Sequence, residues 1–178
     1  MLDKESFKRL FTEHYQNLFQ LSLNLLRDSD LAHDCVQDVY TKIWERKEQL
    51  MVKVPIEVYL KKAVINTSIN YQKRLSRQIP IHQNFDLPEE EQRNIDHEQF
   101  RKLLESGINV LPKKCRVIFI LSRIEGLDNQ EISDYLDLSK KTIENQLSIA
   151  LKNLKQFCEQ EKNKYPQKYF NLFAFFIL

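Results

Sequence analysis

The sequence predicts an all-α protein: two small helical bundles joined by a linker, with a helix-turn-helix in the second bundle. Three observations predict this fold class. Apolar residues recur at helical spacing along most of the 178 residues. Only two glycines occur, and the alternation of β-branched residues that is typical of strands is nearly absent. Between the two helical regions, residues 78–96 contain two prolines and a run of three glutamates, which indicates a linker.

The first bundle begins with two amphipathic segments. Residues 5–27 carry apolar residues at the i, i+3, i+4, i+7 spacing of a helix, namely Phe7, Leu10, Phe11, Leu18, Leu21 and Leu25. A second helix is predicted over residues 30–47, because Asp28 or Ser29 can accept the free N–H groups of its first turn. Its buried side is expected to comprise Leu31, Cys35, Val36, Val39, Ile43 and Trp44.

A third helix is predicted over residues 56–77, because Pro55 suits a first turn. Its expected buried stripe is Ile56, Tyr59, Leu60, Ala63, Thr67 and Tyr71. Residues 53–77 hold six basic residues against one acidic residue, a net charge of +5. A basic face that also carries tyrosines and Asn66 suits an unstacked nucleic-acid strand. The alternative is an ordinary basic amphipathic helix whose tyrosines belong to the core.

Helical signals resume after the linker. Gly107 and Gly126 fall where a helix would need a left-handed end. Asp128 with Glu131 resembles a capping box, and Ser139 can cap the last long helix. The predicted helices of this bundle cover residues 97–106, 112–126, 128–136 and 140–163.

The segment EISDYLDLSKKTIENQL, residues 131–147, has the pattern of a helix-turn-helix. Asp137 occupies the turn position often given to glycine, and aspartate is among the few residues that tolerate a left-handed backbone. The apolar residues expected to interlock the two helices are Ile132, Tyr135, Leu136, Leu138, Ile143, Leu147 and Leu151.

If the second helix of this motif enters a major groove, its outward residues would contact DNA. These are Lys140, Lys141, Glu144, Asn145, Ser148 and Lys152. Asn145 can bind adenine through two hydrogen bonds, and Glu144 can accept from the cytosine amine. A solvated helix face fits the same pattern equally well. Residues 128–155 hold four basic and five acidic residues, a net charge of −1, so this motif alone should bind DNA weakly.

Charge is distributed unevenly over the rest of the chain. Residues 101–127 hold six basic and two acidic residues, a net charge of +4. The second helix instead carries Asp34, Gln37 and Asp38 within two turns. An acidic surface does not favour phosphates, so this one suits a protein partner. The alternative is that it serves only solubility.

Other chemistry is not indicated. Three widely spaced cysteines predict buried free thiols in a reducing cytoplasm. The histidines show no metal-ligand spacing, and neither a nucleophile–base pair nor a phosphate loop occurs, so we expect no metal, no cofactor and no enzyme activity. We also expect no secretory peptide at the N-terminus and no membrane span, since no apolar run reaches about 18 residues.

Together these segments resemble an extracytoplasmic-function (ECF) sigma factor of the bacterial sigma-70 family. DCVQDVYTKIWE (34–45) is similar to region 2.2 of that family, and YLKKAVINTSINYQKR (59–74) to regions 2.3 and 2.4. Residues 111–155, from LPKKC to LKNLK, are similar to region 4. The resemblance covers about residues 5–160, with the motifs in the family's order.

The resemblance implies roles for particular residues. Asp34, Gln37 and Asp38 would bind the clamp coiled coil of the β′ subunit of core RNA polymerase. Promoter DNA at the −10 element would be melted, with a flipped base held under the loop at residues 48–56 and near Asn66. Lys61, Lys62, Lys73 and Arg74 would hold the DNA backbone. The helix-turn-helix residues, with Ile149 added, would read the −35 element, next to the β flap of the polymerase.

The resemblance also divides the chain and implies its regulation. Residues 1–77 would be region 2, residues 97–163 region 4, and residues 164–178 an apolar tail. A membrane-bound anti-sigma factor would hold the two bundles together and keep this cytoplasmic protein at the membrane. Within the tail, YFNLFAFFIL (169–178) is too short to span a bilayer. It would pack on its own bundle, join an anti-sigma partner or touch a membrane surface, and we favour the first two.

Two other functions remain open at this point. A stand-alone helix-turn-helix regulator, with residues 1–77 as a ligand or dimerisation domain, would bind duplex DNA without polymerase. A helical enzyme or adaptor would not support polymerase-dependent transcription. Because the recognition helix lacks the arginines common in the family and Asp137 replaces the usual glycine, the −35 sequence stays open. A DNA-binding unit that is tethered to polymerase does not need high DNA affinity of its own, because tethering raises its effective concentration.

Overall fold

The computed structural model describes residues 3–48, 54–78 and 95–177. Every regular element within these ranges is a helix, which confirms the predicted fold class. The chain divides into two compact units, Met1–Leu87 and Pro88–Leu178. Most of the predicted linker, residues 79–94, lies outside the described residues.

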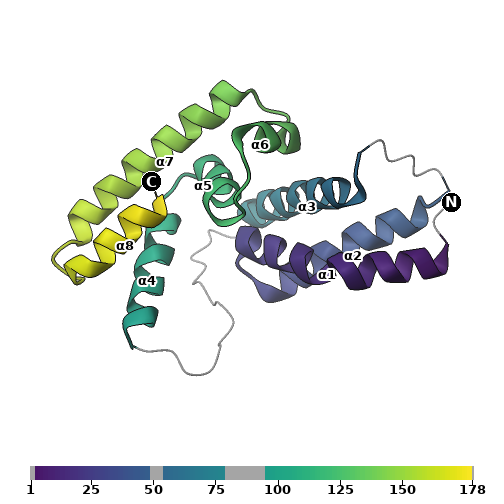
Figure 1. The fold of residues 1–178 in the computed structure, drawn as a ribbon, viewed down its shortest axis with the longest axis horizontal. Helices are drawn as coiled ribbons and strands as arrows, with labels where there is room; N and C mark the ends of the chain where they lie inside the picture. Colours follow the sequence, from purple (N-terminus) through teal and green to yellow (C-terminus); the bar gives the residue numbers. More distant parts are fainter. Residues whose placement is uncertain (1–2, 49–53, 79–94, 178) are drawn as a thin grey trace. The chain divides into compact units, whose positions relative to one another are not determined.

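The first unit packs three helices side by side (Figure 1). These are α1 (Lys4–Leu26), α2 (Ser29–Glu45) and α3 (Ile56–Gln78). The carboxylate of Asp3 caps α1 by accepting the N–H of Ser6 at 2.7 Å. Asp28 caps α2 in the same way, accepting the N–H of Leu31 at 2.9 Å, as the sequence predicts.

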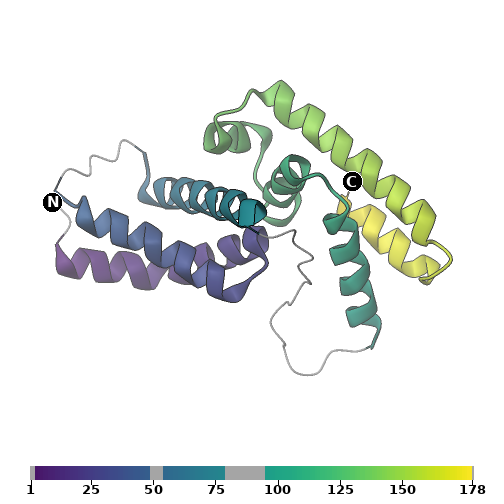
Figure 2. The ribbon, with the colours of Figure 1, turned by 180° about the vertical axis from the view of Figure 1, so that it is seen from behind.

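The three helices lie against one another, as the view from behind also shows (Figure 2), and the core of the first unit lies between them. Its fully buried apolar residues include Leu18, Leu21, Leu25, Cys35, Val36, Val39, Leu60, Val64 and Ile65. One polar cluster joins the helices inside this core: the hydroxyl of Ser68 lies 3.1 Å from that of Ser22 and 3.4 Å from the thiol of Cys35. The buried polar atoms of this cluster therefore have partners, as burial requires.

The predicted buried stripe of the third helix is partly wrong. Leu60 is buried as expected, but the fully buried positions that follow it are Val64, Ile65 and Ser68. The other predicted stripe residues are only half-buried: Ile56, Tyr59, Ala63, Thr67 and Tyr71. Because α3 packs against both α1 and α2, burial centres on the line that faces the groove between them, and this line is turned by about one residue from the expected stripe.

The second unit contains five α-helices and one π-helical turn among its described residues. They are α4 (Ile95–Asn109), α5 (Lys113–Phe119), the π turn η1 (Ile120–Ile124), α6 (Asn129–Leu136), α7 (Lys140–Glu161) and α8 (Gln167–Ile177). The predicted capping box at the start of α6 is present, with the Asp128 carboxylate accepting the N–H of Glu131 at 2.8 Å and the Glu131 carboxylate accepting the N–H of Asp128 at 2.9 Å. Ser139 caps α7 by accepting the N–H of Thr142 at 3.1 Å.

The prediction of one regular helix from 112 to 126 is wrong in its second half. After α5 the chain widens into η1, in which the N–H of Glu125 donates to the carbonyl of Ile120, five residues earlier, at 3.0 Å. A π turn takes one more residue than an α turn, so the following side chains are displaced around the axis. Ile124 would continue the apolar stripe of a regular helix; here it is 37% exposed. Gly126 then ends the segment with φ of +68°, in the left-handed region as predicted.

The prediction for Gly107 is wrong. It lies inside α4, which continues to Asn109, and not at a left-handed helix end. The reason for a glycine here is space: a Cβ atom on Gly107 would lie 2.8 Å from Cζ of Phe173 and 3.2 Å from Cε1 of Phe157. Glycine therefore lets the rings of α7 and α8 approach the backbone of α4.

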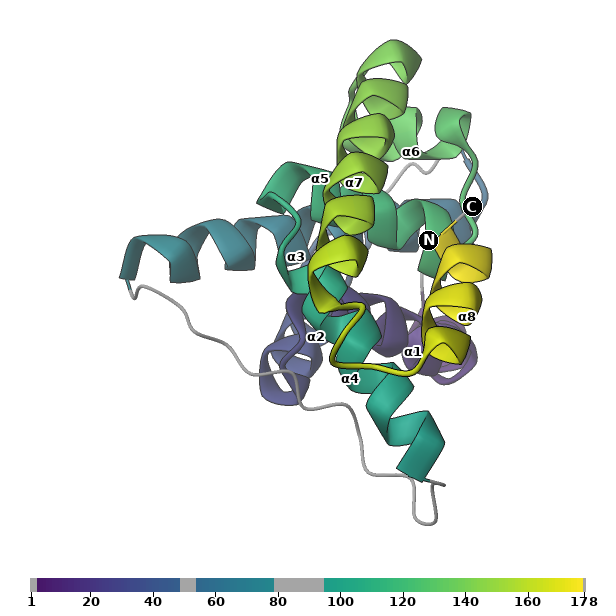
Figure 3. The ribbon, with the colours of Figure 1, turned by 90° about the vertical axis from the view of Figure 1, so that its left-hand side faces the viewer.

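The apolar tail forms α8 and packs on its own unit, next to α4 and α7 (Figure 3). Phe173 is fully buried and its ring contacts that of Phe157, with centroids 6.5 Å apart. The hydroxyl of Tyr169 donates to Oε1 of Gln99 on α4 at 3.3 Å. Of the three positions considered for the tail, packing on its own bundle is the one that the structure bears out.

Candidate functional site

The acidic surface of the first unit lies on α2. Asp34 and Gln37 are exposed and Asp38 is half-buried. Their spacing of three and four residues places them on one face of the helix. The opposite face, with Cys35, Val36 and Val39, is in the core. The burial of that apolar face fixes the direction in which the three polar residues point.

Asp38 is held to the neighbouring helix by Tyr71. The hydroxyl of Tyr71 donates to Oδ2 of Asp38 at 2.9 Å. Burial, reinforced by this hydrogen bond, raises the pKa of Tyr71 to about 12. The phenol therefore keeps its proton at neutral pH and remains a donor. Spacing along the sequence gave no signal for this contact, because its partners lie 33 residues apart.

The predicted basic and polar residues of α3 do not all share one face. Helical geometry places Lys62, Asn66 and Lys73 within about 40° of one another around the axis. Lys61 and Arg74 diverge from Lys62 by about 100° and 120°, to opposite sides. All five are exposed except Lys62, which is half-buried. The structure thus brings together three of the five predicted residues, while Arg74 lies beside Tyr71, with Cζ 6.0 Å from the ring centroid.

Most of the predicted base-pocket loop, at residues 49–53, lies outside the described residues. Its described end carries two apolar side chains that sequence reasoning did not single out: Val54 is 49% exposed and Val58 is 36% exposed. Val54 lies two residues before α3 and Val58 lies in its first turn. Val58 is four residues before Lys62, so it lies on the same side of the helix as Lys62 and Asn66.

The turn of the helix-turn-helix is built as predicted. Asp137 adopts φ of 54° and ψ of 44°, and its N–H donates to the carbonyl of Ser133, which ends α6. The N–H of Leu138 donates to the same carbonyl at 3.2 Å, and the Ser133 hydroxyl donates to the carbonyl of Leu138. Aspartate thus takes the left-handed position without glycine.

The interlock between α6 and α7 uses fewer residues than expected. Ile132 and Ile143 are fully buried and Tyr135 is 5% exposed. The other predicted members are half-buried, namely Leu136, Leu147 and Leu151. Leu138 is 39% exposed, so its placement in the interlock is wrong. The turn's carbonyl and N–H groups bond back to Ser133, and this geometry directs the Leu138 side chain outward.

All six predicted reading residues of α7 are exposed: Lys140, Lys141, Glu144, Asn145, Ser148 and Lys152. Ile149 is 44% exposed beside them. The opposite face of α7 is buried, and its buried residues include Ile143, Ala150 and Leu154. Anchoring on that side directs the six predicted residues away from the core of the second unit.

One basic residue of the second unit has a structural role that its charge alone did not predict. Nη2 of Arg116 donates to the carbonyls of Asn109 and Leu111, at 2.5 and 3.0 Å, and so closes the end of α4. Burial lowers the pKa of Arg116. Its guanidinium is therefore committed to the protein and should not be counted in a phosphate-binding surface.

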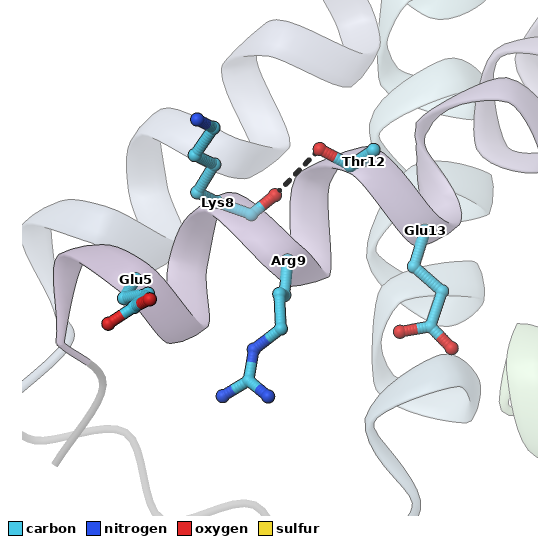
Figure 4. Close-up of a pocket in the computed structure, with 5 residues that line it drawn as sticks. All are labelled: Glu5, Lys8, Arg9, Thr12 and Glu13. Carbon is cyan, nitrogen blue, oxygen red and sulfur yellow. Dashed lines mark hydrogen bonds between the residues drawn. The ribbon is translucent and has the colours of Figure 1, made fainter.

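A pocket on α1 contains none of the predicted residues (Figure 4). It is lined by Glu5, Lys8, Arg9, Thr12 and Glu13, all exposed and all from one helix. The hydroxyl of Thr12 donates to the carbonyl of Lys8 at 2.9 Å. Because every residue that lines it is exposed and belongs to one helix, the pocket does not enclose a small molecule and is not a site candidate.

The cysteines are free thiols, buried at Cys35 and Cys115 and half-buried at Cys158. Burial raises the pKa of each of them, most directly by penalising the thiolate. Within the ranges that the structure describes, no three His, Cys, Asp or Glu residues come together as a metal site. None of the helices in these ranges combines the length and the apolar character needed to cross a bilayer.

Comparison with protein families gives two matches, in order along the chain. The family model for Sigma-70 region 2 matches residues 10–78. The family model for Sigma-70, region 4 matches residues 101–154. Together they span both units and leave α8 outside the matched segments.

Curated relatives match over most of their length. The RNA polymerase sigma-E factor of Streptomyces antibioticus is 25% identical over 154 residues, 86% of this chain and 84% of that protein. The RNA polymerase sigma factor SigZ of Bacillus subtilis (strain 168) is 26% identical over 175 residues, 95% of this chain and 96% of that protein. SigV of the same organism is 24% identical over 156 residues, 85% of this chain and 93% of that protein.

Several solved structures share the fold, two of them as follows. The sigma factor RpoE in complex with the anti-sigma factor NepR, from Bartonella quintana, has a TM-score of 0.66 at 19% identity, covering 87% of this chain and 98% of that one. CnrH in complex with the cytosolic domain of CnrY has a TM-score of 0.61, also at 19% identity, covering 89% of this chain and 91% of that one.

Proposed function

The chain belongs to the sigma-70 family, as an RNA polymerase sigma factor of the ECF type, and from this membership we propose how its helices divide the work of initiation. Its partners are core RNA polymerase and promoter DNA, and its function is to direct the polymerase to specific promoters and promote DNA melting. We assign region 2 to residues 1–77 and region 4 to residues 97–163, joined by the linker at 78–96. The tail at 164–178 completes the second unit.

Polymerase binding is assigned to Asp34, Gln37 and Asp38. The observation that carries this assignment is that the three lie on one face of α2 while its other face is buried. Their fixed direction lets them engage a basic helical partner such as the β′ clamp coiled coil with little ordering cost. Charge at such a surface should govern the rate and specificity of association.

Contact with the −10 element is assigned to α3. Lys62, Asn66 and Lys73 share a face that suits one DNA strand, with Lys61 and Arg74 holding backbone phosphates on either side. The exposed Val54 and Val58 would border an unstacked base. Melting would then follow from binding the opened strand more tightly than the duplex, without any hydrolysis.

The −35 element is assigned to α7. Its first-turn lysines would hold phosphates, and Glu144, Asn145 and Ser148 would face base edges. The net charge of −1 over residues 128–155 makes this unit a weak DNA binder alone. Tethering to the polymerase supplies the effective concentration that its own charge does not. A stand-alone regulator would lack this help, and the family matches do not favour that function.

The chain acts as a binding subunit and not as an enzyme, and it works in the cytoplasm. Because RpoE of Bartonella quintana was solved in complex with the anti-sigma factor NepR, and CnrH with the cytosolic domain of CnrY, we extend such regulation to the present chain, with a membrane-bound anti-sigma factor masking both DNA-binding surfaces. Affinity capture of the chain from cells tests this. A co-purifying membrane protein that competes with core polymerase is expected; recovery of polymerase alone would contradict it.

The polymerase-binding assignment is tested by reversing one exposed charge. Asp34→Lys should weaken binding to purified core polymerase by at least about tenfold, measured by fluorescence anisotropy of the labelled chain. Glu13→Lys on α1 makes the same charge change at another exposed position and should leave the affinity within about twofold. Equal effects of the two variants would show that only net charge matters and would remove the assignment.

A further inference from the structure

The outward face of α7 is rich in hydrogen-bond acceptors at its centre. The hydroxyl of Ser148 donates to the backbone carbonyl of Glu144 at 2.9 Å. The hydroxyl proton of Ser148 is therefore engaged within the helix, and the lone pairs of its oxygen can accept a hydrogen bond from a ligand. The Glu144 carboxylate is an acceptor only, and no side chain in the described part of the chain forms an ion pair with it.

The helix also presents these groups side by side. Glu144 and Ser148 are four residues apart, and Asn145 and Ile149 are four residues apart, so two parallel rows occupy one face. Ile143, Ala150 and Leu154 are fully buried behind them, which fixes the direction of both rows. Lys140 and Lys141 precede the rows, where the helix N-terminus also attracts phosphate, and Lys152 follows them.

Base chemistry decides what such a face can read. In the major groove cytosine presents an amine donor, adenine an amine donor with one acceptor, and guanine only the acceptors O6 and N7. A carboxylate next to two guanine acceptors is repelled and leaves a desolvated charge without a partner. The centre of this face contains no arginine, the residue that most often binds guanine.

We propose that Glu144, Asn145 and Ser148 make this chain select exocyclic amines in its −35 element, with cytosine opposite Glu144, adenine opposite Asn145, and guanine excluded from the position that Glu144 reads. Ile149, which is 44% exposed, adds contact with a thymine methyl group next to them. This specificity rests on the proposed role of α7 at the −35 element.

A promoter library tests the proposal. Holoenzyme is reconstituted from the full chain and core polymerase of the organism that encodes it, and transcripts are sequenced from templates randomised only across the −35 region. The wild-type chain should enrich cytosine and adenine at adjacent or nearly adjacent positions of one strand. It should reject guanine at the cytosine position by roughly tenfold.

Glu144→Gln should abolish that rejection, because the amide can donate to guanine O6 or N7, while the other positions keep their preference. The Ser148 bond goes to the backbone carbonyl, so the substitution leaves it in place. Ser148→Ala, a second variant, should weaken selection at one amine position. The matched control is Glu159→Gln, the same change at an exposed residue of α7 about 22 Å along the axis; its enriched sequences should equal the wild type.

The outcomes separate the base preference of α7 from its role at the −35 element. Enrichment of guanine opposite Glu144, or an unchanged profile in Glu144→Gln, would overturn the amine-reading proposal while −35 selection as such still stood. Transcription without any selection across the randomised region would overturn both, because α7 would then read no −35 element.

Discussion

The hydroxyl of Tyr71 on α3 donates a 2.9 Å hydrogen bond to the Asp38 carboxylate on α2. This bond joins the helix assigned to polymerase binding to the helix assigned to the −10 element. The two helices also share the buried cluster of Ser68 and Cys35, with a distance of 3.4 Å. The acidic and basic surfaces therefore belong to one rigid piece of the first unit, so that docking on polymerase also orients α3.

A double-mutant cycle measures the coupling of this pair. Hydrogen bonds to charged groups contribute about 1.5–3 kcal/mol, and partial exposure of both partners reduces the expected coupling between Tyr71→Phe and Asp38→Ala to about 1 kcal/mol. Urea unfolding of the wild type, both single variants and the double variant gives this quantity. The pair Tyr71→Phe with Asp34→Ala serves as the control and should be additive. Additivity for Asp38 as well would show that the bond contributes nothing.

High pH should destabilise the first unit through Tyr40, which is buried, and Tyr71, which is half-buried. Burial is the main reason that the pKa of Tyr71 and that of Tyr40 are raised to about 12, from about 10 in the unfolded chain. Between these values the folded state holds protons that the unfolded state releases, so this contribution is complete below pH 10 and disappears as the pH rises to 12.

The double variant Tyr40→Phe, Tyr71→Phe should therefore lose less unfolding free energy than the wild type between pH 9 and 11.5. Chemical denaturation at a series of pH values measures the difference. Parallel curves for the two proteins would mean that neither phenol is protected in the folded state.

Gly107→Ala should destabilise the second unit, although alanine is the better helix former. In an open helix interior the change would stabilise by roughly 0.5–1 kcal/mol. Here the added Cβ would lie 2.8 Å from the buried ring of Phe173, and overpacking of this kind costs about 1–3 kcal/mol. Adding Phe173→Leu should recover part of the loss, measured by thermal unfolding. A higher melting temperature for Gly107→Ala would contradict the contact.

The C-terminal helix should contribute through one face only. Phe173 is fully buried and Leu172, its neighbour on α8, is 49% exposed. Truncation of a buried phenylalanine costs about 3–5 kcal/mol, so Phe173→Ala should melt the second unit at a clearly lower temperature. Leu172→Ala removes a similar apolar side chain and should cost less than about 0.5 kcal/mol. A similar loss of stability in both variants would mean that α8 does not pack through the Phe173 face as described.

The sequence predicted best what is decided locally. Caps such as Asp28 and Ser139, and the left-handed Asp137, depend on groups within about four residues. Gly107 was misplaced because its constraint comes from Phe173, far along the chain. The partner of Asp38 was missed for the same reason.

Local sequence also did not determine which face of α3 is buried. Its buried line was set by the groove between two other helices, and a single stripe of apolar residues does not determine where that groove lies. The π turn at Ile120–Ile124 is a further example, since its apolar residues fit a regular helix equally well. The exposure of the six polar residues assigned to DNA reading on α7 was predictable, because an outward position on a helix follows from local spacing, while their role in reading DNA stays a prediction.

Transcription by core polymerase with and without this chain is the decisive test of its function as a sigma factor. Start sites are mapped by sequencing the transcripts made from genomic DNA of the organism that encodes the chain. With the chain present, transcripts should begin at a defined set of promoters that share −35 and −10 sequences, and the Asp34→Lys variant should lose these starts. Identical start sites in the presence and absence of the chain would contradict its assigned role.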